Sequence, residues 1–198
     1  PIVGSTLPIG VGVAWNMARK QIPGVVVIYF GDGATEEGVF SESLDFASLK
    51  NLPVLFVCEN NLYSVYTPIE ERQNPLRKIT QIAEAHGITS NSGDGNSIED
   101  VCTLSSQAID YIRERKKPYF LEFSTYRWLE HCGPNWDDHL GYRKKNELKQ
   151  WMTQCPIKKC EKDIKDEKII SDNDFRMIAE SIDLEIQEAF EFAKSSPF

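Results

Sequence analysis

Residues 25 to 63 read VVVIYFGDGATEEGVFSESLDFASLKNLPVLFVCENNLY, and this stretch decides the fold that we expect. Two apolar runs, Val25 to Phe30 and Pro53 to Cys58, flank a helical stretch, and each run ends in small or polar residues. This spacing predicts a parallel strand–helix–strand unit. Because both loops of such a unit emerge at the carboxyl ends of neighbouring strands, they lie where open α/β sheets bind ligands.

The two loops at that edge carry residues suited to a metal and a phosphate. The first loop is Gly31-Asp32-Gly33 and the second is Asn60-Asn61-Leu62-Tyr63, with 26 residues between them. Asp32 and Asn61 offer hard oxygen donors, which suit Mg²⁺, an ion that keeps phosphate oxygens and water in its remaining positions. Gly33 allows close approach of the backbone, and the following helix presents free N–H groups at its N-terminus. A metal-bridged phosphate is the expected ligand.

This combination of motifs resembles a known family. GDG followed after 26 residues by a double Asn is similar to the diphosphate and metal motif of thiamine-diphosphate enzymes. GDGATEEG together with ENNLY resembles the alpha subunit of 2-oxoacid dehydrogenases. The resemblance implies a three-layer α/β fold, with a mostly parallel sheet and helices on both faces. It covers residues 1 to 198 as a single domain that begins part-way into the alpha subunit, so we expect a missing N-terminal portion and a nearly complete C-terminus.

The same resemblance implies a set of cofactor contacts in the first half of the chain. Asp32, Asn61 and the carbonyl of Tyr63 would ligate Mg²⁺. The diphosphate would lie against Gly31-Asp32-Gly33, which we call the glycine turn. An Ile-Val-Gly segment matches the part of the family that contacts the rings of thiamine diphosphate. The contacts implied for this half are Val3, Asp32, Gly33, Ala34 and Asn61.

A third parallel strand, Tyr119 to Ser124, is expected to deliver Thr125-Tyr126-Arg127 to the same edge of the sheet. Arg127 could reach a phosphate there, or it could form a surface salt bridge. The following loop, about residues 127 to 142, resembles the family's mobile active-site loop. In that loop an Arg closing a TYR triplet and a His four residues later approach the cofactor, which implies Arg127 and His131 as contacts and His131 as the catalytic residue.

The long loop departs from the family pattern. Leu129 stands where the first His would be, Cys132 stands where the Ser would be, and about two extra residues precede Gly141-Tyr142-Arg143. Leu129 removes one expected polar contact, for which His139 either compensates or merely caps a turn. The sequence therefore leaves the identity of the 2-oxo acid open.

By resemblance, the chain takes part in oxidative decarboxylation of a 2-oxo acid and transfer of the acyl group to lipoyl. In the family, the glutamate that activates the cofactor comes from a beta subunit. We therefore expect a heterotetramer, a lipoyl-bearing acyltransferase as second partner, and no turnover by this chain alone. Two alternatives remain: another thiamine-diphosphate enzyme, transketolase-like or acyloin-forming, or a non-catalytic cofactor-binding subunit.

Composition limits the class of partner. A net charge of -8 and a pI near 5.0 argue against a nucleic-acid surface. No run approaches the roughly 20 apolar residues of a membrane span. Five scattered cysteines suggest reduced thiols in a cytoplasmic protein, and Cys155 with Cys160 lacks the companions of a zinc site.

The remaining segments give weaker predictions. Residues 64 to 74 are expected to form a loop, and a second GDG, residues 93 to 95, is expected to be a turn before a helix. Residues 155 to 171 are expected to be a solvated connector. A C-terminal helix with one apolar stripe is predicted over about residues 172 to 194.

Overall fold

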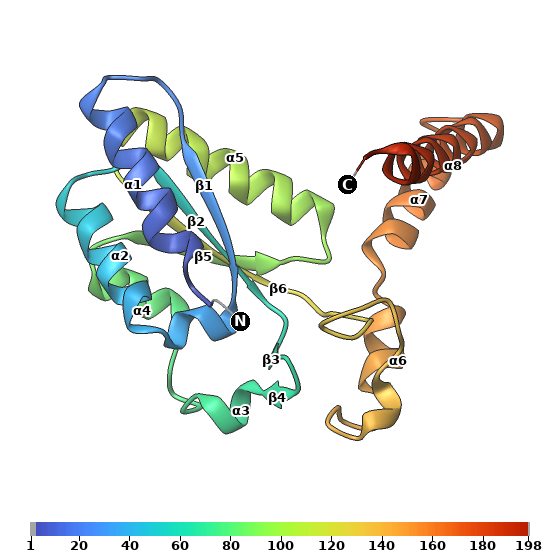
Figure 1. The fold of residues 1–198 in the computed structure, drawn as a ribbon, viewed down its shortest axis with the longest axis horizontal. Helices are drawn as coiled ribbons and strands as arrows, with labels where there is room; N and C mark the ends of the chain where they lie inside the picture. The colour runs from blue at the N-terminus through green and yellow to red at the C-terminus, as the bar shows by residue number, and fades with distance from the viewer. Residues whose placement is uncertain (1–2, 198) are drawn as a thin grey trace. The chain divides into compact units, whose positions relative to one another are not determined.

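The computed structural model describes residues 3–197 and contains a sheet of four parallel strands (Figure 1). The strand order is β1-β2-β6-β5, and each neighbouring pair is parallel. The register places Gly31 opposite Glu59 and Asn60 opposite Ser124, so the three sequence-predicted strand ends lie at one edge. The strands are β1 Val26–Gly31, β2 Val54–Asn60, β5 Thr89–Asp94 and β6 Tyr119–Ser124.

Spatial contacts divide the chain into two compact units, the first ending at Gln154 and the second beginning at Cys155. One domain was expected for the whole chain. The first unit contains the sheet and the helices α1 Thr6–Arg19, α2 Gly38–Leu49, α3 Ile69–Arg72, α4 Ile79–Ala85, α5 Ile98–Arg115 and α6 Glu147–Met152, with the 3-10 turns η1 Asp32–Glu36 and η2 Asp138–Leu140.

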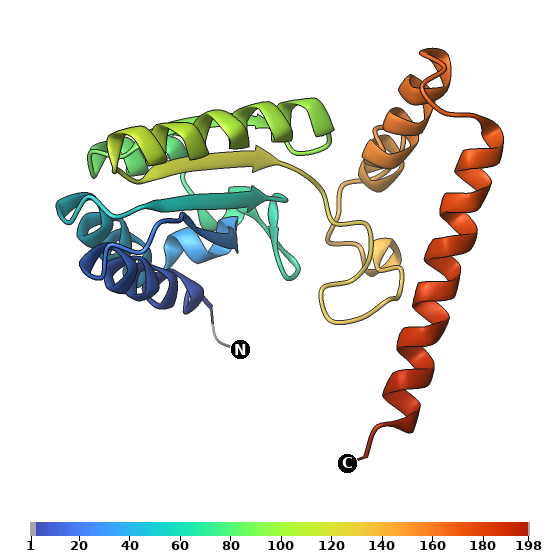
Figure 2. The same ribbon diagram turned by 90° about the horizontal axis from the view of Figure 1, so that it is seen from above.

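Helices cover both faces of the sheet, because β2 is apolar on both sides (Figure 2). Phe56 and its alternate neighbours on β2 pack in one core cluster with buried residues of α1, α2 and α4. Leu55 and Val57 point to the opposite face, where they pack with Ala108 and Ile112 of α5. The expected three-layer α/β fold is confirmed.

The prediction that residues 64 to 74 form a loop is wrong. This segment begins in a small antiparallel ribbon, β3 Tyr63–Ser64 and β4 Thr67–Pro68, and continues as the short helix α3. Val65 adopts a positive φ of 57° in the tight turn, and the N–H of Ile69 donates to the carbonyl of Leu62 at 2.8 Å. Elements this short have too few apolar residues to show a period in the sequence.

The second unit consists of two helices, α7 Pro156–Asp166 and α8 Asp172–Ser195. The prediction of a connector over 155 to 171 is corrected by α7, in which Pro156 occupies the start of the helix, where its missing N–H costs nothing. The C-terminal helix is confirmed, and Ser171 caps it in a capping box with Asp174. Its apolar stripe is exposed at Ile178, Ile182, Ile186 and Phe190.

No helix within residues 3–197 is long and apolar enough to cross a membrane.

Candidate functional site

A cavity of about 360 Å³ lies at the carboxyl ends of β1 and β2. Its lining comes from the segment before α1, the end of β1, η1, the loop after β2 and the long loop after β6. Seven of the sequence-predicted site residues line it together: Val3, Asp32, Gly33, Ala34, Asn61, Tyr63 and His131. Arg127 is the one predicted site residue that is not part of this lining.

The glycine turn after β1 is built for close approach. A Cβ added to Gly33 would lie 2.7 Å from Oγ of Ser64, so a larger residue would push the two loops apart. The hydroxyl of Thr35 donates to the carbonyl of Asp32 at 2.6 Å and fixes the 3-10 turn. The side chain of Asp32 is only 1% exposed, although the residue borders the cavity.

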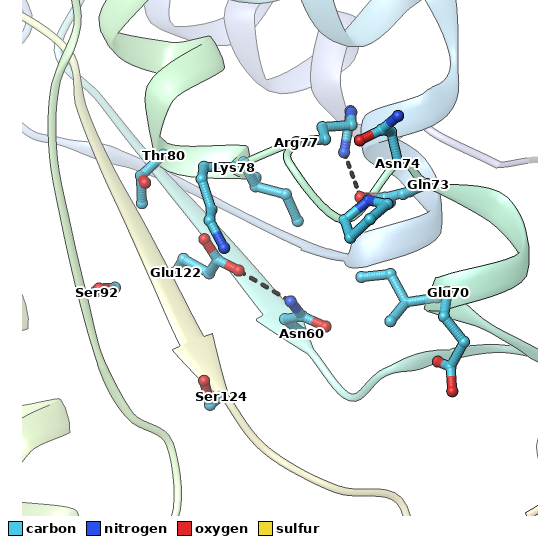
Figure 3. Close-up of a pocket in the computed structure, with 13 residues that line it drawn as sticks. Asn60, Glu70, Gln73, Asn74, Arg77, Lys78, Thr80, Ser92, Glu122 and Ser124 are labelled. Atoms are coloured by element: carbon cyan, nitrogen blue, oxygen red, sulfur yellow. Dashed lines mark hydrogen bonds between the residues drawn. The ribbon is translucent and has the colours of Figure 1, made fainter.

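The two asparagines after β2 face different cavities. The amide oxygen of Asn61 accepts from the N–H of Tyr63 at 3.0 Å, and Asn61 borders the 360 Å³ cavity. Asn60 instead donates through Nδ2 to Glu122 at 2.9 Å and borders a second cavity of about 430 Å³, where Arg77 also lies (Figure 3). Successive residues leaving a strand point to opposite sides, so only one of the pair can serve each cavity.

The segment that follows β4 holds the glycine turn in place, and the sequence reading did not find this role. The guanidinium of Arg72 donates to Oδ2 of Asp32 and to Oε1 of Glu36. Gln73 donates to the same Glu36 oxygen at 2.7 Å. Arg77 donates to the carbonyl of Thr35 at 2.6 Å and to the amide oxygen of Gln73 at 2.6 Å, the second of which is drawn in Figure 3.

The only local signal of this role was a pair of arginines, Arg72 and Arg77, soon after the second loop. Arginine side chains are mostly exposed to solvent, so the sequence alone could not assign the contacts. Burial of the Arg77 guanidinium lowers its pKa from the usual value, which is the mark of a cation drawn into the protein.

The donor set of the 360 Å³ cavity fits a small hard cation. Within residues 3–197 no group of three or more His, Cys, Asp and Glu side chains could hold a metal. A divalent ion at Asp32, Asn61 and the carbonyl of Tyr63 would therefore need further oxygen ligands, which phosphate and water supply to Mg²⁺.

The long loop is organised by a second buried aspartate, Asp137. Its Oδ1 accepts from Arg143 at 2.8 and 3.0 Å, and its Oδ2 accepts from the hydroxyl of Tyr142 and from Arg127 at 3.3 Å. Burial alone would raise the pKa of Asp137, but the hydrogen bonds from Tyr142 and Arg143 and the nearby positive charges outweigh it. The pKa of this carboxyl therefore lies below its usual value.

Arg127 belongs to this network rather than to the cavity. Its second guanidinium nitrogen donates to the carbonyl of Val65 at 2.8 Å and to the hydroxyl of Tyr142 at 3.1 Å. Val65 borders the cavity, so Arg127 lies one residue behind the cavity wall. Its contact with a phosphate stays a prediction.

Aromatic rings connect the long loop to the segment that begins at Tyr63. The guanidinium carbon of Arg143 lies 5.7 Å from the ring centre of Tyr63 and 5.0 Å from that of Tyr126. The hydroxyls of both tyrosines donate to Glu147, at 2.5 and 3.1 Å. Burial raises the pKa of the Tyr126 hydroxyl to about 12. Arg143 lowers this pKa and Glu147 raises it, so their effects oppose each other. These contacts fix the backbone of Tyr63, whose carbonyl is the predicted third metal ligand.

Two positions that depart from the family pattern, Leu129 and Cys132, lie close to His131 in sequence but have different surroundings. His131 is exposed and borders the cavity. The carbonyl of Leu129 accepts from Arg127, while Cys132 is exposed. His139 is exposed in η2 and, within residues 3–197, does not line the cavity.

Comparison with solved structures supports the class of fold. A chain from Mycobacterium smegmatis described as a thiamin diphosphate-dependent enzyme superposes with a TM-score of 0.50 at 21% identity, covering 64% of this chain and 23% of that chain. A transketolase mutant from Pichia stipitis gives a TM-score of 0.53 at 18% identity, covering 62% of this chain and 19% of that chain. The chain therefore has the α/β fold of these enzymes.

Comparison of sequences identifies the family. Residues 1–198 match the family described as the dehydrogenase E1 component, and the chain belongs to this family. It is 33% identical over 196 residues to the pyruvate dehydrogenase E1 component subunit alpha of Rickettsia conorii, covering 99% of this chain and 59% of that protein. The corresponding subunit of Porphyra purpurea is 32% identical over 202 residues, covering 98% and 58%. The chain spans about three-fifths of the length of these relatives.

Proposed function

We propose that this chain is part of the alpha subunit of a thiamine-diphosphate-dependent 2-oxoacid dehydrogenase. The observation that carries the proposal is the single cavity that brings Asp32, Asn61 and Tyr63 together with Val3 and His131. These residues come from four separate segments, and a purely structural turn would not require them to converge. The relatives are named as pyruvate dehydrogenase subunits, so pyruvate is the first substrate to test.

In this proposal the edge of the sheet holds the metal and the diphosphate. Asp32, Asn61 and the carbonyl of Tyr63 would ligate Mg²⁺, and the backbone of Gly33 and Ala34 would lie against the diphosphate. Val3 would contact the rings. When bound, thiamine diphosphate supplies the nucleophilic carbon and the electron sink that decarboxylation of a 2-oxo acid requires.

His131 is proposed to move a proton at the open side of the cavity. Its imidazole is exposed and borders the cavity, so it can exchange protons with water while facing a bound substrate. It would also assist transfer of the acyl group to a lipoyl group, which must enter from outside. To contact the cofactor, the Arg127 guanidinium would leave the carbonyl of Val65 and the carboxylate of Asp137 and bind a phosphate oxygen.

The proposed assembly is a heterotetramer in the cytoplasm. A beta subunit would supply the glutamate that activates the cofactor, and a lipoyl-bearing acyltransferase would accept the acyl group. This division of labour predicts that the alpha protein alone binds the cofactor weakly and does not turn over.

Calorimetry with Mg²⁺ and thiamine diphosphate tests the proposal on the full chain together with its beta partner. Asp32→Ala should abolish metal-dependent binding. Asp94→Ala is the matched control, since Asp94 belongs to the other GDG and does not line the cavity. Its carboxylate accepts from the N–H of Asn96 at a distance of 2.8 Å. Absence of cofactor binding by the assembled pair would refute the enzyme proposal and leave a different role for the cavity.

Substrate assays separate the alternatives. Release of carbon dioxide from pyruvate or branched-chain 2-oxo acids supports the dehydrogenase, and cleavage of acetoin supports an acyloin-type enzyme. Transfer of a two-carbon unit between sugar phosphates supports a transketolase-like enzyme. Cofactor binding without any of these activities supports a non-catalytic subunit. The departures from the family's active-site loop at Leu129 and Cys132 would then agree with the missing activity.

A further inference from the structure

The carboxylate proposed to ligate the metal already has a cationic partner in this chain. Arg72 donates to Oδ2 of Asp32 and to Glu36, and its Nε–H donates to the carbonyl of Thr67 at 3.1 Å. The side chain of Arg72 is 10% exposed and that of Asp32 is 1% exposed. The guanidinium therefore neutralises a carboxylate that water barely reaches.

A guanidinium and a divalent cation compete for such a carboxylate. Two positive charges held a few ångströms apart in a partly buried site repel each other strongly, because the protein interior screens charges less than water does. Tight binding of the metal to Asp32 thus requires Arg72 to move or to find a new anion. If Arg72 moved away, Glu36 would keep a hydrogen-bond donor, because Gln73 donates to the same Glu36 oxygen at 2.7 Å.

A phosphate group is the suitable new anion. Nη1 of Arg72 lies 3.7 Å from the position that a Cβ on Gly33 would occupy, so the guanidinium already borders the backbone proposed to receive the diphosphate. Guanidinium groups bind phosphate oxygens in a two-point geometry that matches their fork of donors. Arg72 would also offset the negative charge of Glu36 and Glu37, which otherwise repels a phosphate at this turn.

We propose that Arg72 is the counter-ion of Asp32 while no divalent cation is bound, and that it transfers from Asp32 to the diphosphate when the metal arrives. This inference rests on the proposed cofactor site. It makes binding of the metal and of the diphosphate cooperative, because the metal releases Arg72 to the diphosphate and the diphosphate draws Arg72 away from Asp32. The metal alone binds weakly, and the two together bind well.

Binding of Mn²⁺, followed by the electron paramagnetic resonance signal of the free ion, tests this on the full chain together with its beta partner. Arg72→Gln should bind Mn²⁺ alone about tenfold or more tightly than the native chain, since one competing charge is gone. Addition of thiamine diphosphate should strengthen Mn²⁺ binding strongly in the native chain and much less in Arg72→Gln. Arg72→Lys, which keeps the charge, should retain the weak binding of the metal alone.

Lys144→Gln is the matched control. Lys144 is 71% exposed and pairs with Glu70 of α3 at 2.7 Å, so the variant removes one positive charge near α3 without touching Asp32. Its Mn²⁺ affinity should stay within about twofold of the native value, because exposed pairs contribute little. Thermal unfolding by circular dichroism verifies that each variant is folded.

The outcomes separate this inference from the proposed function. If the folded native chain and Arg72→Gln, each assembled with the beta partner, bind neither Mn²⁺ nor thiamine diphosphate, the cofactor site itself is refuted, and the role of Arg72 with it. If the native chain binds both but Arg72→Gln binds the metal alone no more tightly, only the role of Arg72 is overturned. A gain that Lys144→Gln reproduces equally would also overturn it, as an effect of net charge.

Discussion

Two buried aspartates, Asp32 and Asp137, are equally inaccessible to water but are held in different ways. Each is 1% exposed. Asp137 accepts from two arginines and a tyrosine, with bonds to both carboxylate oxygens. In the described part of the chain Asp32 is paired with one arginine, through Oδ2, and it borders a cavity.

The difference indicates two uses of the same side chain. A carboxylate whose lone pairs are filled by the protein has no capacity left for a ligand, so Asp137 fixes the shape of the long loop. A carboxylate with one internal partner at a cavity keeps capacity for an external cation. Substitutions at the two aspartates and their partners should therefore differ in size and in kind.

Asp137→Asn is expected to have the largest effect on stability. It leaves the Arg143 guanidinium, whose side chain is 2% exposed, without its charged partner. Breaking a buried ion pair on one side costs about 3 kcal/mol, which corresponds to a fall in Tm of roughly 10 °C for a chain of this size. Urea denaturation of Asp137→Asn beside the exposed neighbour Asp138→Asn measures it, and equal stability of the two variants would contradict the role of Asp137.

Tyr142→Phe removes a single donor from the same network. The hydroxyl of Tyr142 donates to Asp137, while the ring packs 5.5 Å from the ring of Tyr63, centre to centre. Loss of one hydrogen bond to a charged group should cost about 1.5 kcal/mol, with the ring contact kept. Tyr66→Phe, on the exposed ring beside Tyr142, should cost less than about 0.5 kcal/mol; a larger loss there would point to ring packing instead.

Acid should weaken the long loop through Asp137. The pKa of this carboxyl is lower in the folded chain than its unfolded value of about 3.9, so its stabilising contribution is complete above that pH. The contribution is lost as the pH falls through the lower, folded pKa. Melting curves between neutral pH and pH 3 measure the difference in Tm between the native chain and Asp137→Asn. This difference should shrink in acid, and a difference that stays constant with pH would disprove the linkage.

Asp32→Asn should have the smallest effect on stability. Arg72 keeps its contacts with Glu36 and with the carbonyl of Thr67, so its charge is not left alone. We expect a loss of about 1 kcal/mol or less, together with loss of metal binding. Denaturation and metal titration on the same variant check both parts; a loss as large as that of Asp137→Asn would erase the distinction between the two aspartates.

The arrangement of the first strands was predictable because it follows from local pattern. Apolar runs of strand length, broken by Gly31-Asp32-Gly33 and by the double Asn, place both loops at one edge of a parallel sheet by the geometry of the connection. The predicted strands and the observed β1, β2 and β6 differ by a few residues at most. The resemblance to the family added Val3 and His131, which no pattern of periodicity would have selected.

The partners of the site were not predictable in the same way. Arg72 meets Asp32 across 40 residues and Arg77 meets Thr35 across 42, so neither contact has a signature in a local window. The short helix that ends at Arg72 and the irregular segment that contains Arg77 lack a readable period. For Arg127 the sequence left a phosphate contact and a salt bridge open, and packing of the long loop pairs it with Asp137.

The sequence by itself determined the parallel unit, the turn at Asp32 and the family, because apolar period, glycine position and motif spacing are properties of the chain alone. The tertiary structure decided which asparagine faces which cavity and which arginine neutralises which aspartate. Those choices depend on the direction of side chains and on charges brought together from distant segments. For this reason the ligands of the proposed metal could be named in advance, while Arg72, which competes for one of them, could not.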